Sequence, residues 1–180
     1  MVTSGVVFYA FFGLGWLLAG LGHFGGLVTG VAGTLGLVLA LALVRIARQQ
    51  AAQLADQESE PLLPAKRRRF AQVNAVQWSL IVAAAVGCSA GRVPELTLPL
   101  VAIVVGLHFL PLARVFDDAR LITPGVVLAA LGVAGLLAWA ADASRGTVYT
   151  LVGVGCAVTL WSTALWSLVG IRRAAAEESA

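Results

Sequence analysis

The sequence predicts an all-α fold, a polytopic membrane bundle of six transmembrane helices. The first observation behind this prediction is composition: 59% of the 180 residues are hydrophobic and only 12% are charged. A soluble domain of this length ordinarily carries about 25% charged residues. A chain this apolar cannot cover its surface in water, so we expect the lipid bilayer to be its solvent.

The second observation is the length of the apolar runs. A bilayer core about 30 Å thick requires roughly 20 apolar residues per helix, and in lipid a helix satisfies its backbone groups within its own segment. Six runs meet this length and cover residues 5–24, 26–46, 71–90, 96–116, 123–141 and 147–171. We therefore treat residues 1–180 as a single membrane domain whose longest loop covers residues 47–70.

The third observation is the placement of positive charge. All of the 12 lysines and arginines except Arg92 and Arg145 lie at the end of, or after, the second, fourth or sixth run. The positive-inside rule places such segments in the cytoplasm, which predicts that both termini are cytoplasmic (N-in/C-in). The use of arginine, with Lys66 as the only lysine, and the excess of Ala, Gly, Val and Leu indicate a GC-rich bacterial genome. We expect a multi-pass protein of the bacterial inner (plasma) membrane whose first run is retained.

Several classes of function are not expected from this sequence. The net charge of +3 comes from residues in short loops, so it does not indicate a nucleic-acid partner. Cys88 and Cys156 fall within apolar runs and are expected to be packing residues rather than a disulfide or metal ligands. No nucleophile, phosphate-loop or dinucleotide motif occurs. We therefore expect neither an enzyme nor a bound cofactor or metal.

A basic tetrad, Lys66, Arg67, Arg68 and Arg69, directly precedes the third run. One interpretation is that the tetrad sets the topology by touching anionic lipid headgroups. The other interpretation is that it forms a docking site for an acidic partner or ligand.

Small residues recur at three- and four-residue spacing in two of the runs. They are Gly22, Gly26, Gly30 and Gly33 in or just before the second run, and Gly125, Ala129, Gly132 and Gly135 in the fifth. Such spacing lets helix backbones approach closely, which is how membrane helices pack. We interpret both stripes as packing faces; the alternative is that they are hinges of a moving transporter.

The tryptophans divide by depth. Trp78 and Trp139 lie near predicted interfaces, where aromatic belts form. Trp161 lies deeper in the sixth run, and we expect it to face another helix.

Polar side chains inside the runs are the best pointers to function, because the bilayer penalises them. Asn74, Gln77 and Trp78 are spaced i, i+3 and i+4 and share a helical face. At 1.5 Å per residue, Gln77 lies about 9 Å and His108 about 12 Å from the cytoplasmic ends of their runs. If the third and fourth helices are neighbours, these groups lie at a similar depth.

The histidine and a nearby proline suggest a site. We hypothesise that an amide of the third helix holds His108, and that Pro111 opens the fourth helix by freeing the carbonyl of Leu107. Such a site would bind a small polar solute or relay a proton, since histidine titrates near neutrality. The alternative is a structural hydrogen bond between helices, worth about 1 kcal/mol or less.

The two histidines of the chain both precede phenylalanine, as His23-Phe24 and His108-Phe109. They fall in opposite halves of the chain, as the halves of an inverted repeat would place them. Two matches this short do not distinguish a repeat from coincidence.

The segment after the fourth run carries Arg114, Asp117, Asp118 and Arg120. No further residue with metal-ligand spacing accompanies the two carboxylates. We expect a solvated loop with local ion pairs.

Two stretches carry a resemblance to a group of known proteins. They read Phe70-x3-Asn74-x2-Gln77-Trp78 and Gly106-Leu107-His108-Phe109-x-Pro111-Leu112-Ala113-x2-Phe116. Both stretches resemble an uncharacterised group of small bacterial multi-span integral membrane proteins. The resemblance implies a multi-span membrane protein and carries no activity or ligand. It favours treating Asn74, Gln77, His108 and Pro111 as one constellation.

We expect one of two functions. In the first, the protein binds or passes a small polar solute or a proton through a cytoplasm-facing pocket, with His108 as the titratable group. In the second, it is a non-transporting accessory or structural subunit that packs with a protein partner through a glycine face. A water-accessible cavity at His108 would favour the first, and a filled bundle with an exposed small-residue stripe would favour the second. Six short helices leave little room for a wide pathway, so we expect a homo-oligomer.

Overall fold

The computed structural model describes residues 2–53 and 64–178, with side chains placed over residues 5–52 and 64–170. Every regular element in these ranges is helical. The helices are α1 (Val2–Leu21), α2 (Gly26–Gln53), α3 (Pro64–Ala90), α4 (Thr97–Phe116), α5 (Ile122–Ala140) and α6 (Arg145–Glu178), joined in part by the short 3-10 helices η1 (Gly22–Phe24), η2 (Pro94–Leu96) and η3 (Ala119–Leu121). Within the described residues, six helices are long and apolar enough to cross a membrane, which confirms the predicted number of helices of that length.

The segment predicted as a loop over residues 47–70 is helical at both ends, and the helix-forming composition of residues 46–57 already favours the extension of the second helix. Residues 47–53 continue α2, and residues 64–70 form the first turns of α3. The cause is composition, because Ala, Gln and Arg are good helix formers and Pro64 suits the first position of a helix. The remainder of the predicted loop lies outside the described residues.

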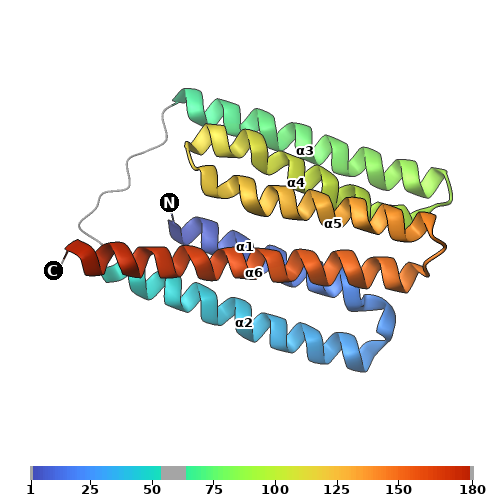
Figure 1. Cartoon of the computed structure of the whole chain (residues 1–180), viewed down its shortest axis with the longest axis horizontal. Coiled ribbons are helices and arrows are strands. Elements are labelled where there is room, and N and C mark those ends of the chain that lie inside the picture. The colour runs from blue at the N-terminus through green and yellow to red at the C-terminus, as the bar shows by residue number, and fades with distance from the viewer. Residues whose placement is uncertain (1, 54–63, 179–180) are drawn as a thin grey trace.

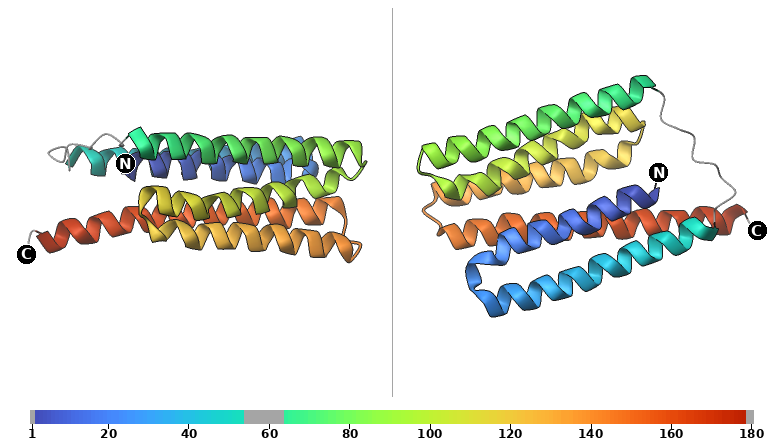
Figure 2. Two further views of the ribbon diagram at one scale, coloured as in Figure 1. Left: turned by 90° about the horizontal axis from the view of Figure 1, so that it is seen from above. Right: turned by 180° about the vertical axis from the view of Figure 1, so that it is seen from behind.

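The helices follow one another across the bundle in the order α3, α4, α5, α6, α1 and α2 (Figure 1). Seen from above, α4, α5 and α6 form one layer, and α1, α2 and α3 lie on one side of it (Figure 2). The two ends of this order are α3, which packs chiefly on α4, and α2, which packs chiefly on α1. In consequence only 11% of an 18-residue apolar stretch of α3 is buried inside the bundle, against 39% of the corresponding stretch of α6.

The inner helices touch backbone to backbone at glycines. A Cβ atom added to Gly20 on α1 would lie 2.9 Å from the Cα of Gly153 on α6. One added to Gly125 on α5 would lie 2.8 Å from the carbonyl oxygen of Gly106 on α4, and one on Gly132 would lie 2.6 Å from the carbonyl oxygen of Pro99. Any side chain at these positions would force the helices apart. The fifth-run stripe is therefore a packing face, as predicted.

The stripe predicted at the second run divides into two parts. Gly33 packs on α1, where an added Cβ atom would meet Leu18 at 3.0 Å; Gly36, which was not in the predicted stripe, does the same against Leu14 at 2.9 Å. Gly22, Gly26 and Gly30 have no neighbour within 4 Å of an added Cβ, in the part of the chain that the structure describes. For these three the packing prediction is wrong within this chain, because they lie on the exposed side of the turn and of α2, whereas Thr29 on the same helix reaches the carbonyl oxygen of Leu21 on α1 at 3.0 Å.

Two smaller predictions about the core are confirmed. The indole Nε1 of Trp161 on α6 donates a hydrogen bond of 3.1 Å to the carbonyl oxygen of Ala10 on α1, so this tryptophan does face another helix. Cys88 and Cys156 are both buried with free thiols. They act as small packing residues.

The basic residues gather at one end of the bundle. The start of α1, the end of α6, the end of α2, the start of α3 and the α4–α5 connection all lie at this end (Figure 1). Arg92 and Arg145 lie at the other end, beside the α3–α4 and α5–α6 connections. The helical arrangement thus keeps the charge asymmetry that the sequence displays.

We predict opposite effects for one substitution at two glycines. Gly125→Ala should lower the free energy of unfolding by about 1–3 kcal/mol, because the new methyl group overpacks the α4–α5 contact. Gly87→Ala on α3 should leave stability unchanged or raise it by up to about 1 kcal/mol, because its Cβ meets nothing within 4 Å. Titration with SDS in bicelles measures both, and equal effects would contradict the backbone contact.

Candidate functional site

Helices α3 and α4 are neighbours, as the predicted site requires. Two contacts at the basic end set their register. The Nζ of Lys66 lies 2.7 Å from the Oδ2 of Asp117, and the rings of Phe70 and Phe116 lie 5.7 Å apart between centroids. The antiparallel pairing therefore brings the polar part of α3 and the His108 turn of α4 to a similar depth.

The polar residues of α3 do not share one environment. Gln77 is only 8% exposed, and because α3 packs chiefly on α4, its side chain faces the α3–α4 interface. Asn74 is half-buried. Trp78 is 59% exposed and turns outward. The three residues expected on one face are thus split between the interface and the outer surface.

His108 is half-buried in α4, and its imidazole lies beside the backbone carbonyl of Val73 on α3. In the described part of the chain, no hydrogen bond joins His108 to Asn74 or Gln77. The histidine thus lies near the backbone of α3, and within the described residues the predicted hydrogen bond with an amide of α3 is not formed. Because this neighbour is a backbone group, no side-chain substitution in α3 would remove it.

Pro111 lies inside α4, which nevertheless runs without a break from Thr97 to Phe116. A proline in a helix interior removes one backbone donor and leaves the carbonyl four residues earlier, that of Leu107, without its helical partner. The proline loosens the ladder of hydrogen bonds next to His108 without ending the helix.

The charged segment after α4 differs from its prediction. Asp117 pairs with Lys66 of α3 instead of a nearby arginine. The Oδ1 of Asp118 accepts a hydrogen bond of 3.0 Å from the backbone N–H of Arg120 and caps η3. Asp117 thus joins two helices, because the register of α3 on α4 brings the first turn of α3 beside it.

Part of the basic tetrad borders a hollow at the same end of the bundle. This Arg67 hollow has a volume of about 380 Å³ and is lined by Pro64, Arg67, Arg68 and Ala71. Lys66 takes part in the ion pair with Asp117 and does not line it. The four tetrad residues therefore have different surroundings.

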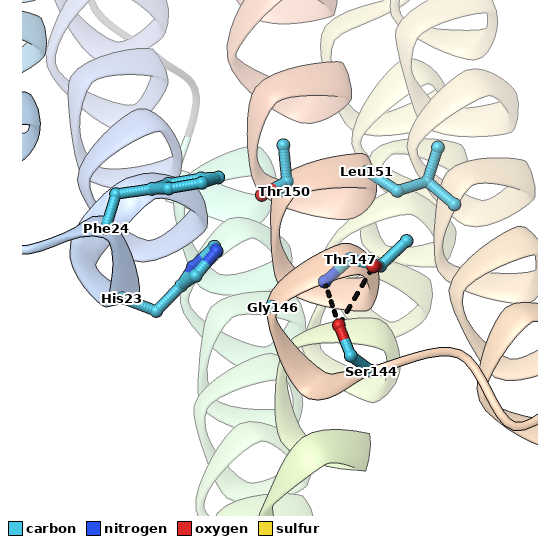
Figure 3. A pocket seen from close by; sticks show the side chains of 7 residues that line it. All are labelled: His23, Phe24, Ser144, Gly146, Thr147, Thr150 and Leu151. Carbon is cyan, nitrogen blue, oxygen red and sulfur yellow. Dashed lines mark hydrogen bonds between the residues drawn. The ribbon is translucent and has the colours of Figure 1, made fainter.

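A second hollow lies at the opposite end of the bundle, between η1 and the start of α6 (Figure 3). This His23 hollow is open, has a volume of about 520 Å³, and is lined by His23, Phe24, Ser144, Gly146, Thr147, Thr150 and Leu151. A Cβ on Gly146 would lie 2.8 Å from the Nε2 of His23. The absence of a side chain there lets the imidazole lie over α6.

The hydroxyl groups at the His23 hollow are already occupied. The Oγ of Ser144 accepts a hydrogen bond of 3.2 Å from the N–H of Thr147 and lies 2.9 Å from its Oγ1, which is the geometry of a helix N-cap. The Oγ1 of Thr150 donates to the carbonyl oxygen of Gly20. Ser144 therefore caps the start of α6, and Thr150 links α6 to the end of α1.

Sequence reasoning missed this second hollow. The available signals were the Gly22–Gly25 turn around His23 and the Ser144-x-x-Thr147 cap. The two His-Phe pairs lie in different settings, because His23 and Phe24 are exposed whereas Phe109 is buried in the core. This difference in burial gives no support to an inverted repeat.

The chemistry open to the predicted site is narrow. Within the described residues, no group of three or more His, Cys, Asp or Glu side chains gathers to hold a metal ion. His108 can exchange a proton or a hydrogen bond, and Gln77 and Asn74 can exchange hydrogen bonds with a polar guest. His108 lines neither the Arg67 hollow nor the His23 hollow.

Comparison with known proteins gives no further guide. No family profile, curated protein or solved structure matches the chain significantly.

We predict that His108→Leu lowers the free energy of unfolding by about 1 kcal/mol or less, because one polar contact with a backbone carbonyl is lost in an apolar setting. Trp78→Leu, at an exposed position of the facing helix, is the control and should lower the free energy of unfolding by less than His108→Leu does. The measurement is SDS titration in bicelles. A loss of several kcal/mol for His108→Leu would instead indicate a network with the α3 amides.

Proposed function

We propose that the chain is a non-transporting accessory or structural subunit that packs with a protein partner through α2. In this proposal it resides in a bacterial plasma membrane with both termini in the cytoplasm. The observation that carries the proposal is the open glycine face of α2, defined by Gly26, Gly30 and Thr34. The glycine faces of the inner helices contact other helices of the same chain, whereas the glycines of this face have no neighbour within 4 Å of an added Cβ in the described residues.

The open glycine face has the shape of a close helix contact. Gly26, Gly30 and Thr34 are spaced by four residues, and Cβ atoms on the two glycines would meet nothing within 4 Å. The Oγ1 of Thr34 donates to the carbonyl oxygen of Gly30 at 2.9 Å, so its polar group is satisfied. Leu27 and Leu35, exposed at 82% and 65%, border the face. Small residues between large ones are the pattern of associating membrane helices.

The interior of the bundle also favours a subunit without a transport pathway. Leu43, Leu128 and Leu160 are fully buried side chains of the core, and the inner helices are in backbone contact. Both described hollows lie at the ends of the bundle rather than along its axis. Glycine contacts this close resist the sliding that alternating access requires.

The proposed orientation follows from the charged end of the bundle. The end that holds the tetrad, Arg114 and Arg120 faces the cytoplasm in this proposal, because positive residues are retained on that side during insertion. The open glycine face starts at the other end of α2, so the partner contacts the chain in the outer half of the membrane.

A photo-crosslinking experiment tests the proposal. A photoreactive amino acid at Val31, beside Gly30, should give a protein adduct of discrete mass in native membranes. The same probe at Leu137 on α5, which is 66% exposed, should give no discrete protein adduct. An adduct at twice the mass of the chain would identify the partner as a second copy.

A second variant sharpens this test. Gly30→Leu should abolish the adduct and leave the fold intact, because its side chain enters open space. Gly87→Leu on α3, a glycine equally open, is the matched control and should leave the adduct unchanged. If the Val31 probe reacts with lipid alone, the accessory-subunit proposal fails.

The second candidate function is a proton or polar-solute site at His108. The observation that favours it is the half-buried imidazole at an interface that also buries Gln77. A pathway along this interface would run between copies of the chain, because α3 lies at the edge of the bundle. NMR of histidine-labelled His23→Gln protein in nanodiscs tests access.

A His108 signal that titrates between about pH 5 and 8 would show that water reaches the imidazole. His108→Ala should then abolish proton or solute flux in vesicles. A signal that stays neutral throughout this range would rule out the second candidate.

A further inference from the structure

We propose that the Arg67 hollow binds the phosphate of an anionic phospholipid, with one acyl chain of that lipid lying along the exposed small-residue stripe of α3. The stripe consists of Ala71, Ala75, Ser79, Ala83 and Gly87. The partner is thus a lipid of the surrounding membrane. This inference concerns α3 and does not depend on a protein partner at α2.

The lining residues form a built face for an anion. Pro64, Arg67, Arg68 and Ala71 recur at i, i+3, i+4 and i+7, so they lie on one face of the first two turns of α3. Two guanidinium groups offer planar, paired donors to phosphate oxygens. The hollow is open, has a volume of about 380 Å³ and is lined by α3 alone, so the phosphate in this proposal stays in contact with water.

The tetrad is divided between two tasks in this arrangement. Lys66 is bound to Asp117 at 2.7 Å and fastens α3 to α4. Arg67 and Arg68 are exposed and line the hollow. The ion pair positions the two arginines, because it fixes the first turn of α3 against the end of α4. The site is therefore more specific than a diffuse attraction between a basic loop and the membrane.

The small-residue stripe continues the hollow into the apolar part of α3. All five members are exposed, and the Oγ of Ser79 donates to the carbonyl oxygen of Ala75 at 2.9 Å, so no polar group is left open. Trp78, Val82 and Val86 rise on one side, exposed at 59%, 57% and 62%. Small residues beside this ridge leave room for an acyl chain, and in this proposal they form the groove that holds it.

The dimensions of the groove suit a lipid chain. From Ala71 to Ala83 the helix rises about 18 Å at 1.5 Å per residue. One leaflet contributes about half of the 30 Å hydrocarbon core, roughly 15 Å. An acyl chain that starts at the Arg67 hollow therefore stays beside the stripe over the depth of its leaflet.

Charge argues for a lipid rather than a second copy on this face. A parallel two-fold pair through the α3 stripe would bring Arg67 and Arg68 of each copy against those of the other. Like charges in contact are unfavourable. A phosphodiester has the opposite sign and is attached to an acyl chain that needs an apolar groove.

Lipid binding to the purified full chain tests the proposal. Native mass spectrometry in neutral detergent should show bound phosphatidylglycerol and little phosphatidylcholine. Arg67→Gln with Arg68→Gln should weaken phosphatidylglycerol binding roughly 30-fold. Arg69→Gln with Arg114→Gln removes the same charge from exposed residues outside the hollow. This pair should weaken phosphatidylglycerol binding by less than about 10-fold. Equal weakening by both pairs would overturn the site.

Two further arms separate the parts of the proposal. Ser79→Phe fills the groove and should weaken phosphatidylglycerol binding, whereas Val76→Phe, a matched exposed position on α3, should not. Equal effects would overturn the acyl-chain groove.

Inorganic phosphate should compete with phosphatidylglycerol only at a far higher concentration than the lipid. Equal competition would show a free-phosphate site and overturn the lipid assignment. A dimer abolished by Ser79→Phe would also overturn it.

Discussion

The backbone contact of the inner helices at glycine is the constraint on which the rest of this structure depends. Gly20 meets Gly153 between α1 and α6, and Gly106 meets Gly125 between α4 and α5. In lipid no hydrophobic force drives helices together, so close approach supplies the packing energy. The first contact joins the two halves of the chain, the second holds the C-terminal half together, and both leave no space between the paired backbones.

The order of the helices follows from these contacts, and it leaves α2 and α3 at the edges. An edge helix offers most of its surface to the membrane, and the two edges differ in chemistry. The open glycine face of α2 begins at the end of the bundle away from the tetrad, which makes it suited to another helix. The stripe of α3 begins at Arg67 and Arg68, which makes it suited to a lipid with a charged head.

The polar residues illustrate what residue spacing can and cannot reveal. Depth along a helix follows from the rise per residue, so His108 and the polar part of α3 were correctly placed at one level. Orientation about the helix axis depends on the neighbour, and α4 buries Gln77 while Trp78 turns outward. Spacing also carries no information on backbone partners, so the contact of His108 with the Val73 carbonyl was not foreseen.

The sequence by itself determined the class of structure: six apolar runs of membrane-spanning length, all helical, with every basic residue except Arg92 and Arg145 on one side. Length, hydropathy and charge are local properties, and the bilayer acts on each segment separately. Only the tertiary structure decided which glycines are used inside the chain, which arginines line a hollow, and that Asp117 pairs with Lys66 rather than with an arginine nearby. Those outcomes depend on which helices meet and in what register, and no single segment contains that information.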